Sequence, residues 1–428
     1  MKILVVGGGG REHAIIWKLL KNKAVKEVHC APGNGGVSDI AKCVPIYATD
    51  IEGIVSYAKR ERFDLVFVAP DDPLYMGMVD RLQQEGIRAF GPTAAAAEIE
   101  GSKAYAKRLM KTYDIPTAEY EEFTDYNSAC DYIDGCSMPA VIKADGLALG
   151  KGVVICGSAE EAKSALEDMM VKKIFGSAGE RVVIEEYLEG PEVSVLAFCD
   201  GKTILPMASA QDHKRAYDSD MGPNTGGMGA FSPSPKYTPQ IQSEVEETII
   251  QKTLFALNQE GRPFKGVIYF GLMLTNKGPR LLEYNARFGD PEAQAVLPRM
   301  KNDLLDIVNA VIDGKLSDIK LEWEDSCAVC VVMASGGYPG KYQKGMEITG
   351  LGDVRDSIVF HAGTSKKDGV YITNGGRVLG VTALGKDISD AREKAYSDVS
   401  KISFEGAQYR SDIGIKETTE TSEPVYSY

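Results

Sequence analysis

The sequence predicts a mixed fold, α/β in the first hundred residues and α+β in the remainder. Residues 1–101 alternate apolar strand-like runs with helical runs, which is the pattern of a doubly wound parallel sheet. Beyond Gly101 the predicted strands come in pairs with helices to one side, which is typical of α+β domains. The chain has 428 residues, of which 44% are hydrophobic and 25% are charged, so it can form about two to four globular domains.

The first predicted domain, residues 1–101, opens on a strand that leads through four glycines into a helix. Its strands are predicted at 2–6, 25–30, 64–69 and 87–90, and its helices at 11–20, 51–60 and 74–84. Strands joined by helical crossovers run parallel, so this domain is predicted to hold one parallel sheet.

The rest of the chain is predicted to form a lid with its linking helix, a catalytic core and a small α+β domain with a polar tail. These regions cover residues 102–190, 191–325 and 326–428. Ser102, the pair Ser158 and Glu161, and Pro239 mark helix starts. Helices are predicted at 102–113, 158–170, 239–260 and 303–313, and strands at 118–123, 140–143, 153–156, 182–186, 193–198, 267–275 and 280–285.

Charge and hydropathy exclude two classes of partner. The net charge of −13 argues against a nucleic-acid or anionic membrane surface, so any phosphate site must be a local basic pocket. No apolar run is long enough to span a bilayer, and Met1 leads directly into the first strand. We therefore expect a cytoplasmic protein with no nucleic-acid or membrane partner.

The segment with the clearest chemistry follows the predicted strand at 280–285. Glu283, Asn285 and Arg287 stand two residues apart, so their side chains point to the same face of the strand. A carboxylate beside an amide oxygen suits Mg²⁺, and a guanidinium can hold a phosphoryl group through paired N–H donors. The alternative is an exposed polar edge of a half-buried strand.

The four glycines at Gly7–Gly10 resemble a dinucleotide-binding loop, but the fingerprint fails. Glu12 stands where the third glycine is needed, and the strand at 25–30 lacks a terminal acid for a ribose diol. A single phosphate on the following helix N-terminus remains one interpretation, and a plain tight turn is the other.

A second glycine-rich loop, residues 144–152, connects two predicted strands. Its spacing does not fit a Walker A loop, which needs four residues between its glycines and a following helix. The loop can instead fold over a triphosphate, with Lys151 at the phosphates. Lys143, in the strand before it, is predicted to be half buried and therefore needs an anion. The alternative is a surface lysine beside a mobile hairpin.

Two blocks between residues 211 and 229 lack an obvious structural purpose. Residues 211–215 place mixed charge and an imidazole after an apolar strand, and residues 222–229 offer several unobstructed amides that form a good anion nest. Either block alone is equally well explained as a loop with solvated charge.

Taken together, these blocks closely resemble the phosphoribosylamine–glycine ligase family of the ATP-grasp superfamily. The resemblance runs essentially end to end. The order of the His-Lys, Asn-Thr-Gly-Gly-Met-Gly and Arg-Phe-Gly-Asp-Pro-Glu blocks distinguishes this family from other ATP-grasp enzymes. The matching blocks lie at residues 9–14, 31–34, 90–93, 143–152, 211–215, 223–229, 287–292, 336–339, 360–364 and 373–378.

The resemblance implies an ATP-grasp fold preceded by a doubly wound pre-ATP-grasp domain and followed by a small α+β domain. It implies ATP-dependent ligation of glycine to 5-phosphoribosylamine through glycyl phosphate, with Mg²⁺ or Mn²⁺ as cofactor, in purine biosynthesis. The partners implied are these small molecules, with a monomeric chain making transient contact with neighbouring enzymes of the pathway.

The resemblance also implies roles for individual residues. It makes Glu283 and Asn285 the metal ligands. The catalytic residues implied are Arg287, Lys143, Asp212 and Asp290. The ATP-binding residues implied are Lys103, Lys143, Lys151, Glu185, Leu188 and Glu192. The substrate-binding residues implied are Gly9, Gly10, His213, Lys214, Asn224, Thr225, Gly226 and Gly227.

Three positions depart from the family pattern. Gly8 stands where many members have asparagine, and Asp71 replaces a glutamate. Residues 265–280 hold no acid, so we expect the metal to rely on two side chains, phosphates and water. Two alternative functions remain open, namely another ATP-grasp carboxylate–amine ligase and a non-catalytic nucleotide-binding sensor. The metal pair and phosphate lysines, which a sensor would have lost, are all present.

Overall fold

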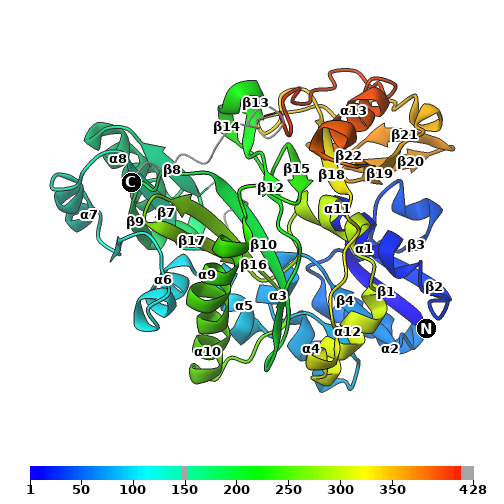
Figure 1. The fold of residues 1–428 in the computed structure, drawn as a ribbon, viewed down its shortest axis with the longest axis horizontal. Helices are drawn as coiled ribbons and strands as arrows, with labels where there is room; N and C mark the ends of the chain where they lie inside the picture. Colours follow the sequence, from blue (N-terminus) through cyan, green and yellow to red (C-terminus); the bar gives the residue numbers. More distant parts are fainter. Residues whose placement is uncertain (147–151, 416–428) are drawn as a thin grey trace.

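The computed structural model describes residues 1–146 and 152–415. Four sheet-based regions make up the fold (Figure 1). The N-terminal sheet and the C-terminal sheet lie on one side of the molecule, the lid sheet lies at the opposite end, and the long strands of the core sheet run between them.

The N-terminal region holds a five-stranded parallel sheet in the order β3-β2-β1-β4-β5, as predicted. Its strands are β1 (Lys2–Gly7), β2 (Glu27–Pro32), β3 (Lys42–Cys43), β4 (Leu65–Val68) and β5 (Ala89–Phe90). Its helices are α1 (Gly10–Leu19), α2 (Ile51–Glu61), α3 (Asp71–Tyr75), α4 (Met78–Gln84) and α5 (Ala94–Gly101). The central strands β1 and β4 are buried along almost their whole length, as strands covered on both faces must be.

One predicted helix of this region is wrong as a single element. The segment predicted as a helix at 74–84 is divided into α3 and α4. The break lies at Gly77, whose φ of 85° is left-handed and therefore incompatible with continuing a right-handed helix. The strand predicted at 25–30 also begins later, at Glu27.

The lid follows α6 (Lys103–Thr112), which starts at Ser102 as predicted, because the Ser102 hydroxyl accepts a hydrogen bond from the amide of Tyr105 (3.0 Å). Its antiparallel sheet has the order β6-β9-β7-β8. The lid strands are β6 (Tyr120–Phe123), β7 (Ala140–Ala144), β8 (Val153–Cys156) and β9 (Val182–Glu186). Helices α7 (Tyr126–Ile133) and α8 (Ala159–Leu166) pack with this sheet around a separate apolar core.

The core sheet is four-stranded and antiparallel, in the order β11-β10-β16-β17. Its strands are β10 (Glu192–Asp200), β11 (Ile204–Pro206), β16 (Lys265–Thr275) and β17 (Gly278–Asn285). Alternate residues of β10 enter two different cores, so the sheet is covered on both faces. One face packs on α9 (Pro239–Val245), a π-helical turn at 246–250 and α10 (Gln251–Gln259), and the other on α12 (Leu304–Asp313).

The C-terminal sheet has the order β12-β15-β18-β22-β19. It is built from β12 (Gln211–Asp212), β15 (Gly229–Ser232), β18 (Cys327–Ala334), β19 (Ser357–His361) and β22 (Arg377–Gly385). Two of these strands, β12 and β15, come from residues assigned by prediction to the catalytic core. The sheet therefore joins the segment at 211–232 directly to the C-terminal region, while the predicted division at residue 326 stays a prediction.

The remaining elements surround this sheet. They are β13 (Arg215–Tyr217), β14 (Met221–Asn224), α11 (Glu292–Val296), β20 (Thr364–Lys367), β21 (Val370–Thr373) and α13 (Ile388–Val399). All eight cysteines are free thiols. Across residues 1–146 and 152–415, none of the helices combines the length and the apolar character that a membrane crossing requires.

Candidate functional site

A cavity of about 1050 Å³ opens where the four regions meet. The N-terminal region contributes Arg11 from α1, and the C-terminal region contributes Arg377 from β22. Most of the predicted site residues line this cavity. They are Lys103, Lys143, Glu185, Leu188, Glu192, Asp212, His213, Lys214, Asn224, Thr225, Gly226, Glu283, Asn285, Arg287 and Asp290.

Three predicted substrate-binding residues do not line the cavity, namely Gly9, Gly10 and Gly227. Gly227 lies just behind the wall, because a Cβ placed on it would meet Pro291 Cδ at 2.5 Å. Lys151, predicted to contact the phosphates, falls outside the described residues together with 147–150.

The lid side of the cavity holds a buried cluster of two lysines around one carboxylate. Lys143 Nζ lies 2.8 Å from Glu185 Oε1, and Lys107 Nζ lies 2.9 Å from Glu185 Oε2. Burial raises the pKa of Glu185, but the two ammonium groups outweigh it and leave that pKa below its usual value. Burial lowers the pKa of Lys107 to about 8. The cluster carries one net positive charge when fully ionised.

Lys103 faces the same part of the cavity from the start of α6. Its ammonium donates to the carbonyl of Gly146 (2.9 Å). Burial lowers the pKa of Lys103, with the positive charge of Lys143 adding to the shift and Glu283 opposing it. One turn of helix separates Lys103 from Lys107, so both ammonium groups project from one face of α6. The three lysines make this side of the cavity a site for an anion.

Strand β17 presents Glu283 and Asn285 to the cavity, as their spacing predicts. Leu281 and Tyr284 are buried in the core of the sheet, whereas Glu283 and Asn285 are half buried. A register shift accompanies this arrangement, because Glu283 pairs with Gly271 and Leu281 pairs with Leu272. Leu282 is thus the extra residue of a β-bulge, which re-aims the side chains that follow.

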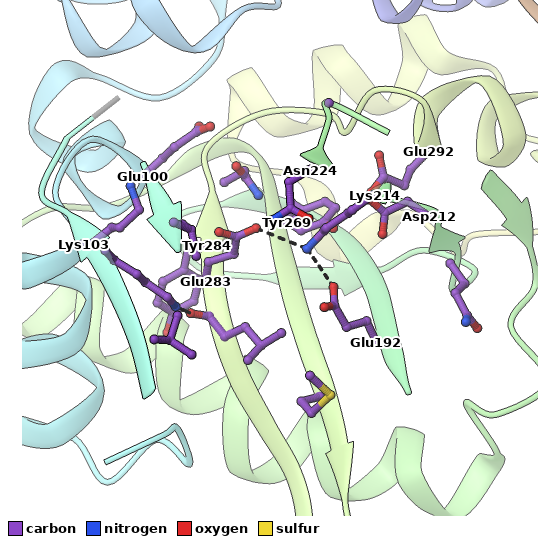
Figure 2. A pocket seen from close by; sticks show the side chains of 18 of the residues that line it. Glu100, Lys103, Glu192, Asp212, Lys214, Asn224, Tyr269, Glu283, Tyr284 and Glu292 are labelled. Atoms are coloured by element: carbon purple, nitrogen blue, oxygen red, sulfur yellow. Dashed lines mark hydrogen bonds and ion pairs between the residues drawn. The ribbon is translucent and has the colours of Figure 1, made fainter. Parts of the chain in front are cut away.

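Lys214 reaches across the cavity between two carboxylates (Figure 2). Its Nζ lies 2.7 Å from Glu192 Oε2 and 3.8 Å from Glu283 Oε1. Burial would lower the pKa of Lys214, but the surrounding carboxylates raise it well above its usual value. Burial likewise acts to raise the pKa of Glu283, and the charge of Lys214 followed by those of Lys143 and Lys103 brings it below its usual value. Glu283 is therefore an ionised oxygen donor.

The donor set at Glu283 and Asn285 fits a hard divalent cation only in part. A carboxylate and an amide oxygen on one face are suitable ligands for Mg²⁺. Asn285 Oδ1 accepts a hydrogen bond from Arg287 Nη2 (3.0 Å), so it has one further lone pair to offer. Within residues 1–146 and 152–415 there is no group of three or more His, Cys, Asp or Glu side chains arranged to hold a metal. Substrate phosphate and water would have to complete the coordination.

Arg287 lies against a buried acid that the sequence did not single out. Its Nη2 lies 2.8 Å from Glu100 Oε1 and 3.9 Å from Asp71 Oδ2. The second oxygen of Glu100 accepts from the amide of Ala286 (2.7 Å). Burial would lower the pKa of Arg287, and these carboxylates raise it. Arg287 Nε is buried and has no hydrogen-bond partner among residues 1–146 and 152–415, so the guanidinium is held in place with one donor unused within this part of the chain.

Asp212 in β12 and Glu292 at the start of α11 add two more carboxylates to the cavity wall. Burial raises the pKa of Asp212 to about 8, with Lys214 opposing the shift and Glu292 adding to it. Glu292 Oε1 accepts from the hydroxyl of Ser194 (3.2 Å), which also bonds Tyr269 Oη (2.8 Å). Figure 2 shows this group beyond Lys214, on the side away from Lys103.

The glycine turn before α1 is occupied by a side chain of its own helix. The Gly9 amide donates to Glu12 Oε2 (2.5 Å), and Arg11 Nε donates to Glu12 Oε1 (2.7 Å). Gly8 also has a packing reason to lack a side chain, because a Cβ there would lie 2.5 Å from the Gly33 carbonyl oxygen. The family's asparagine would need a backbone shift at this position.

The lining residues that were absent from the predicted site include Lys107, Glu100, Glu292 and Arg377. Lys107 could have been found from its spacing to Lys103 on one helix face. Glu292 stands in the Arg-Phe-Gly-Asp-Pro-Glu block and could have been found there. Arg377 stands in the matching block at residues 373–378 and could have been found there as well, whereas Glu100 gave no local signal, because its partner Arg287 lies far away in the chain.

Comparisons with known proteins agree with this geometry. Three models of the phosphoribosylglycinamide synthetase family match the chain: the N domain at residues 1–100, the ATP-grasp (A) domain at 101–293 and the C domain at 328–416. The chain belongs to this family. The ATP-grasp fold predicted from the sequence, with a doubly wound domain before it and an α+β domain after it, is thereby confirmed.

Members of the family resemble the chain over nearly its full length. A phosphoribosylamine–glycine ligase of Caldanaerobacter subterraneus subsp. tengcongensis is 51% identical over 413 residues, which is 96% of this chain and 99% of that protein. The trifunctional purine biosynthetic protein adenosine-3 of Gallus gallus is 50% identical over 97% of this chain and 42% of its own length. The crystal structure of a Thermotoga maritima phosphoribosylamine–glycine ligase superimposes with a TM-score of 0.83 at 37% identity, covering 96% of this chain and 100% of that chain.

Proposed function

We propose that this protein is an ATP-dependent ligase that joins glycine to 5-phosphoribosylamine. The products are glycinamide ribonucleotide, ADP and phosphate, and the reaction belongs to purine biosynthesis. The observation that carries the proposal is the placement of a lysine-lined anion site, the Glu283–Asn285 pair and the Arg287 guanidinium on one cavity. The family membership gives the same reaction.

The lid side of the cavity would bind the nucleotide. Lys103 and Lys143 are placed for the phosphates, because their ammonium groups carry the positive charge that a triphosphate requires. Glu185 in β9, Leu188 in the following connection and Glu192 at the start of β10 line the passage from the lid to the core sheet, where the adenosine would rest. Lys151 is proposed as a further phosphate contact.

The chemistry would proceed in two displacements. A carboxylate oxygen of glycine attacks the γ-phosphorus of ATP and ADP leaves, which gives glycyl phosphate. The amine of phosphoribosylamine then attacks the carbonyl carbon, the C–O bond breaks, phosphate leaves and the nitrogen loses a proton. The first step brings the negatively charged carboxylate to the negatively charged triphosphate, so positioned cations are the main contribution that the protein can make.

Arg287 is the residue best placed to hold the transferring phosphoryl group. Glu100 and Asn285 orient its guanidinium, and the buried Nε retains an unused donor. Lys143, Asp212 and Asp290 complete the proposed catalytic set around the cavity. A guanidinium that is fixed before the substrate arrives loses little entropy on binding.

Glu283 and Asn285 would hold Mg²⁺ or Mn²⁺. Such an ion would supply charge neutralisation at the phosphates of ATP. Glu283 is suited to this because neighbouring lysines keep it ionised.

The opposite side of the cavity would receive glycine and phosphoribosylamine. His213, Lys214 and the loop of Asn224, Thr225 and Gly226 line this side. We extend the substrate-binding proposal to Gly227, Gly9 and Gly10, which do not themselves line the cavity. Gly9 is supported by its nearness to Asp290, whose Oδ2 a Cβ on Gly9 would meet at 3.3 Å.

The partners we propose are small molecules: ATP, glycine and phosphoribosylamine, with no nucleic acid and no membrane. We further propose a cytoplasmic monomer that contacts neighbouring purine-pathway enzymes transiently. The chicken relative supports the last point, since a protein named for three functions in purine biosynthesis contains a segment that matches this whole chain.

The proposed function is tested by the substrate dependence of ADP release. ADP should accumulate only when ATP, a divalent cation, glycine and phosphoribosylamine are all present. Replacing glycine or phosphoribosylamine in turn with members of a panel of amino acids and amines should abolish most of the rate. Strong turnover with another pair would favour a different ATP-grasp ligase, and tight ATP binding without any turnover would favour a nucleotide-binding sensor.

A further inference from the structure

Arg377 extends from the C-terminal region to the wall of the cavity. It is the first residue of β22, and its guanidinium lines the cavity wall. Nη1 donates to the carbonyl oxygens of Gly226 (2.5 Å), Asp290 (2.7 Å) and Gly227 (3.4 Å). Nη2 lies 3.5 Å from Asp290 Oδ2. One guanidinium thus joins the loop at 224–227, called the glycine loop below, to the segment that follows β17.

The glycine loop is shaped to accept this guanidinium. A Cβ on Gly226 would lie 3.0 Å from Arg377 Cζ and 3.1 Å from Nη2, so a larger residue would push the two groups apart. The amide of Gly226 donates to Tyr338 Oη (3.1 Å), a second group of the C-terminal region. The loop is therefore held by the C-terminal region through both its carbonyl and its amide groups.

The contacts of Arg377 suit a guanidinium and not an ammonium. Its planar head offers several N–H donors in fixed directions, whereas a lysine is a single charge on a flexible stem. Loss of the head would leave the Gly226 and Asp290 carbonyls without this donor, and Asp290 without its nearest cation. The C-terminal region would then lose its connection to the loop that lines the cavity.

We propose that Arg377 is a positioning residue that seats the glycine loop against Asp290 for binding the non-nucleotide substrates. The proposal rests on the proposed function, because the substrate role of the loop belongs to it. The C-terminal region would thereby help to form the side of the cavity that receives glycine and phosphoribosylamine. The nucleotide side is independent of Arg377, since Lys103, Lys143 and Glu185 have their own partners in the lid and the core.

Hydrogen exchange of the glycine loop gives a test that does not depend on turnover. In Arg377→Ala, the amides of residues 225–228 should exchange at least about tenfold faster than in the parent protein, because the loop loses its anchor. Arg377→Lys should give nearly the same result. Arg355→Ala is the matched control, because Arg355 is an exposed arginine of the same region whose guanidinium donates to the nearby Gly352 and Val354 carbonyls. It should leave the loop unchanged.

Kinetics of the same variants test the link to substrate binding. In Arg377→Lys, the KM of glycine or of phosphoribosylamine should rise about tenfold while the KM of ATP stays within about twofold. Gly226→Ala keeps Arg377 but crowds its guanidinium, and it should give the same pattern of KM values.

Different results would overturn the positioning role of Arg377 and the proposed ligase function. An unchanged exchange rate in the glycine loop of Arg377→Lys and Gly226→Ala would overturn the positioning role, whatever reaction the protein catalyses. An equal rise in the KM of ATP would also overturn it, because it would indicate a general loss of structure. A parent protein without ligase activity would refute the proposed function, and loop exchange would still report on the anchor.

Discussion

The cationic side chains at the two ends of the cavity differ in how fully they are paired with acceptors of the protein. At the lysine end, Lys107 and Lys143 share the single carboxylate of Glu185, and Lys103 donates to the carbonyl of Gly146. At the arginine end, Arg287 and Arg377 are each surrounded by several acceptors of the protein. The lysine end keeps an excess of positive charge, and the arginine end is nearly neutralised by carboxylates.

This difference indicates two tasks. Ammonium groups with few partners are free to follow a triphosphate as it binds and changes during the reaction. Guanidinium groups with three or more fixed acceptors act as a rigid frame, and they hold backbone segments and carboxylates at set positions. The pKa values agree, because burial lowers the pKa of Lys107 to about 8 while neighbouring carboxylates raise the pKa of Arg287. We expect substitutions at the lysine end to change the binding of ATP, and substitutions at the arginine end to change phosphoryl transfer or the binding of the other substrates.

The largest expected effect lies where the two ends meet, at Glu283. Glu283→Gln keeps the size of the side chain but removes the charge that would face the metal and Lys214. Turnover of MgATP should fall by about a hundredfold or more. Steady-state kinetics across a range of Mg²⁺ concentrations would measure it, with the melting temperature as the control for folding. Parent-like activity at low Mg²⁺ would remove Glu283 from the metal site.

At the lysine end, Lys143→Met should act on the nucleotide. Glu185 keeps Lys107 as a partner, so the fold should persist. The KM of ATP should rise about tenfold to a hundredfold while the KM of glycine changes little. Lys163→Met is the matched control, because Lys163 is a lid lysine whose ion pair with Asp134 is exposed. Equal effects on ATP and glycine would show that the two ends are not separate.

At the arginine end, Glu100→Gln should act on the transfer step. The variant weakens the strongest ion pair of Arg287 and leaves Asp71 at 3.9 Å as its remaining carboxylate. We expect kcat to fall about tenfold with the KM of ATP nearly unchanged. Glu98→Gln is the control, since this residue of the same helix pairs with Arg262 at the surface. A change confined to the KM of ATP would contradict the division of the cavity.

The smallest effect on turnover is expected from a histidine pair away from both ends, which acts on stability instead. His13 in α1 accepts a hydrogen bond at Nδ1 from the amide of His361 in β19 (2.8 Å). Burial lowers the pKa of His13 to about 3 and that of His361 to about 4. Below the ordinary histidine pKa of 6.5 the unfolded chain binds protons that the folded chain does not, so acidification destabilises the fold.

The free energy of unfolding should therefore be fully retained above pH 6.5 and should decrease as the pH falls toward 4. We expect a loss of about 5 kcal/mol by pH 4.5 from this pair, or about 2.5 kcal/mol from each histidine. Urea denaturation at several pH values would measure the slope. His361→Gln should make the slope shallower, and an unaltered slope in that variant would show that His361 is already charged in the folded state.

The sequence could predict those parts of the site that lie within one element. The face shared by Glu283 and Asn285 follows from strand periodicity, and the start of α6 follows from the Ser102 cap. The break at Gly77 could not be predicted, because an isolated glycine in a helical pattern is often tolerated and only its left-handed φ ends the helix.

The parts that escaped prediction depend on contacts between distant segments. Strands β12 and β15 have two and four residues, too few for a period-two pattern. Only the pairing of β15 with β18 and of β12 with β15 reveals them. The partners of Glu100 and Arg377 lie 187 and about 150 residues away along the chain. No local pattern reports such a contact, so these long-range partners became visible only in the folded structure.

The central claim is that the cavity transfers the γ-phosphoryl group of ATP to the carboxylate of glycine. Turnover of glycine labelled with ¹⁸O in both carboxylate oxygens tests it directly, with mass analysis of the phosphate released. If glycyl phosphate forms, one labelled oxygen should pass from each glycine consumed to one phosphate, and the amide product should retain the other. Phosphate without the label, at a normal rate of amide formation, would contradict the claim.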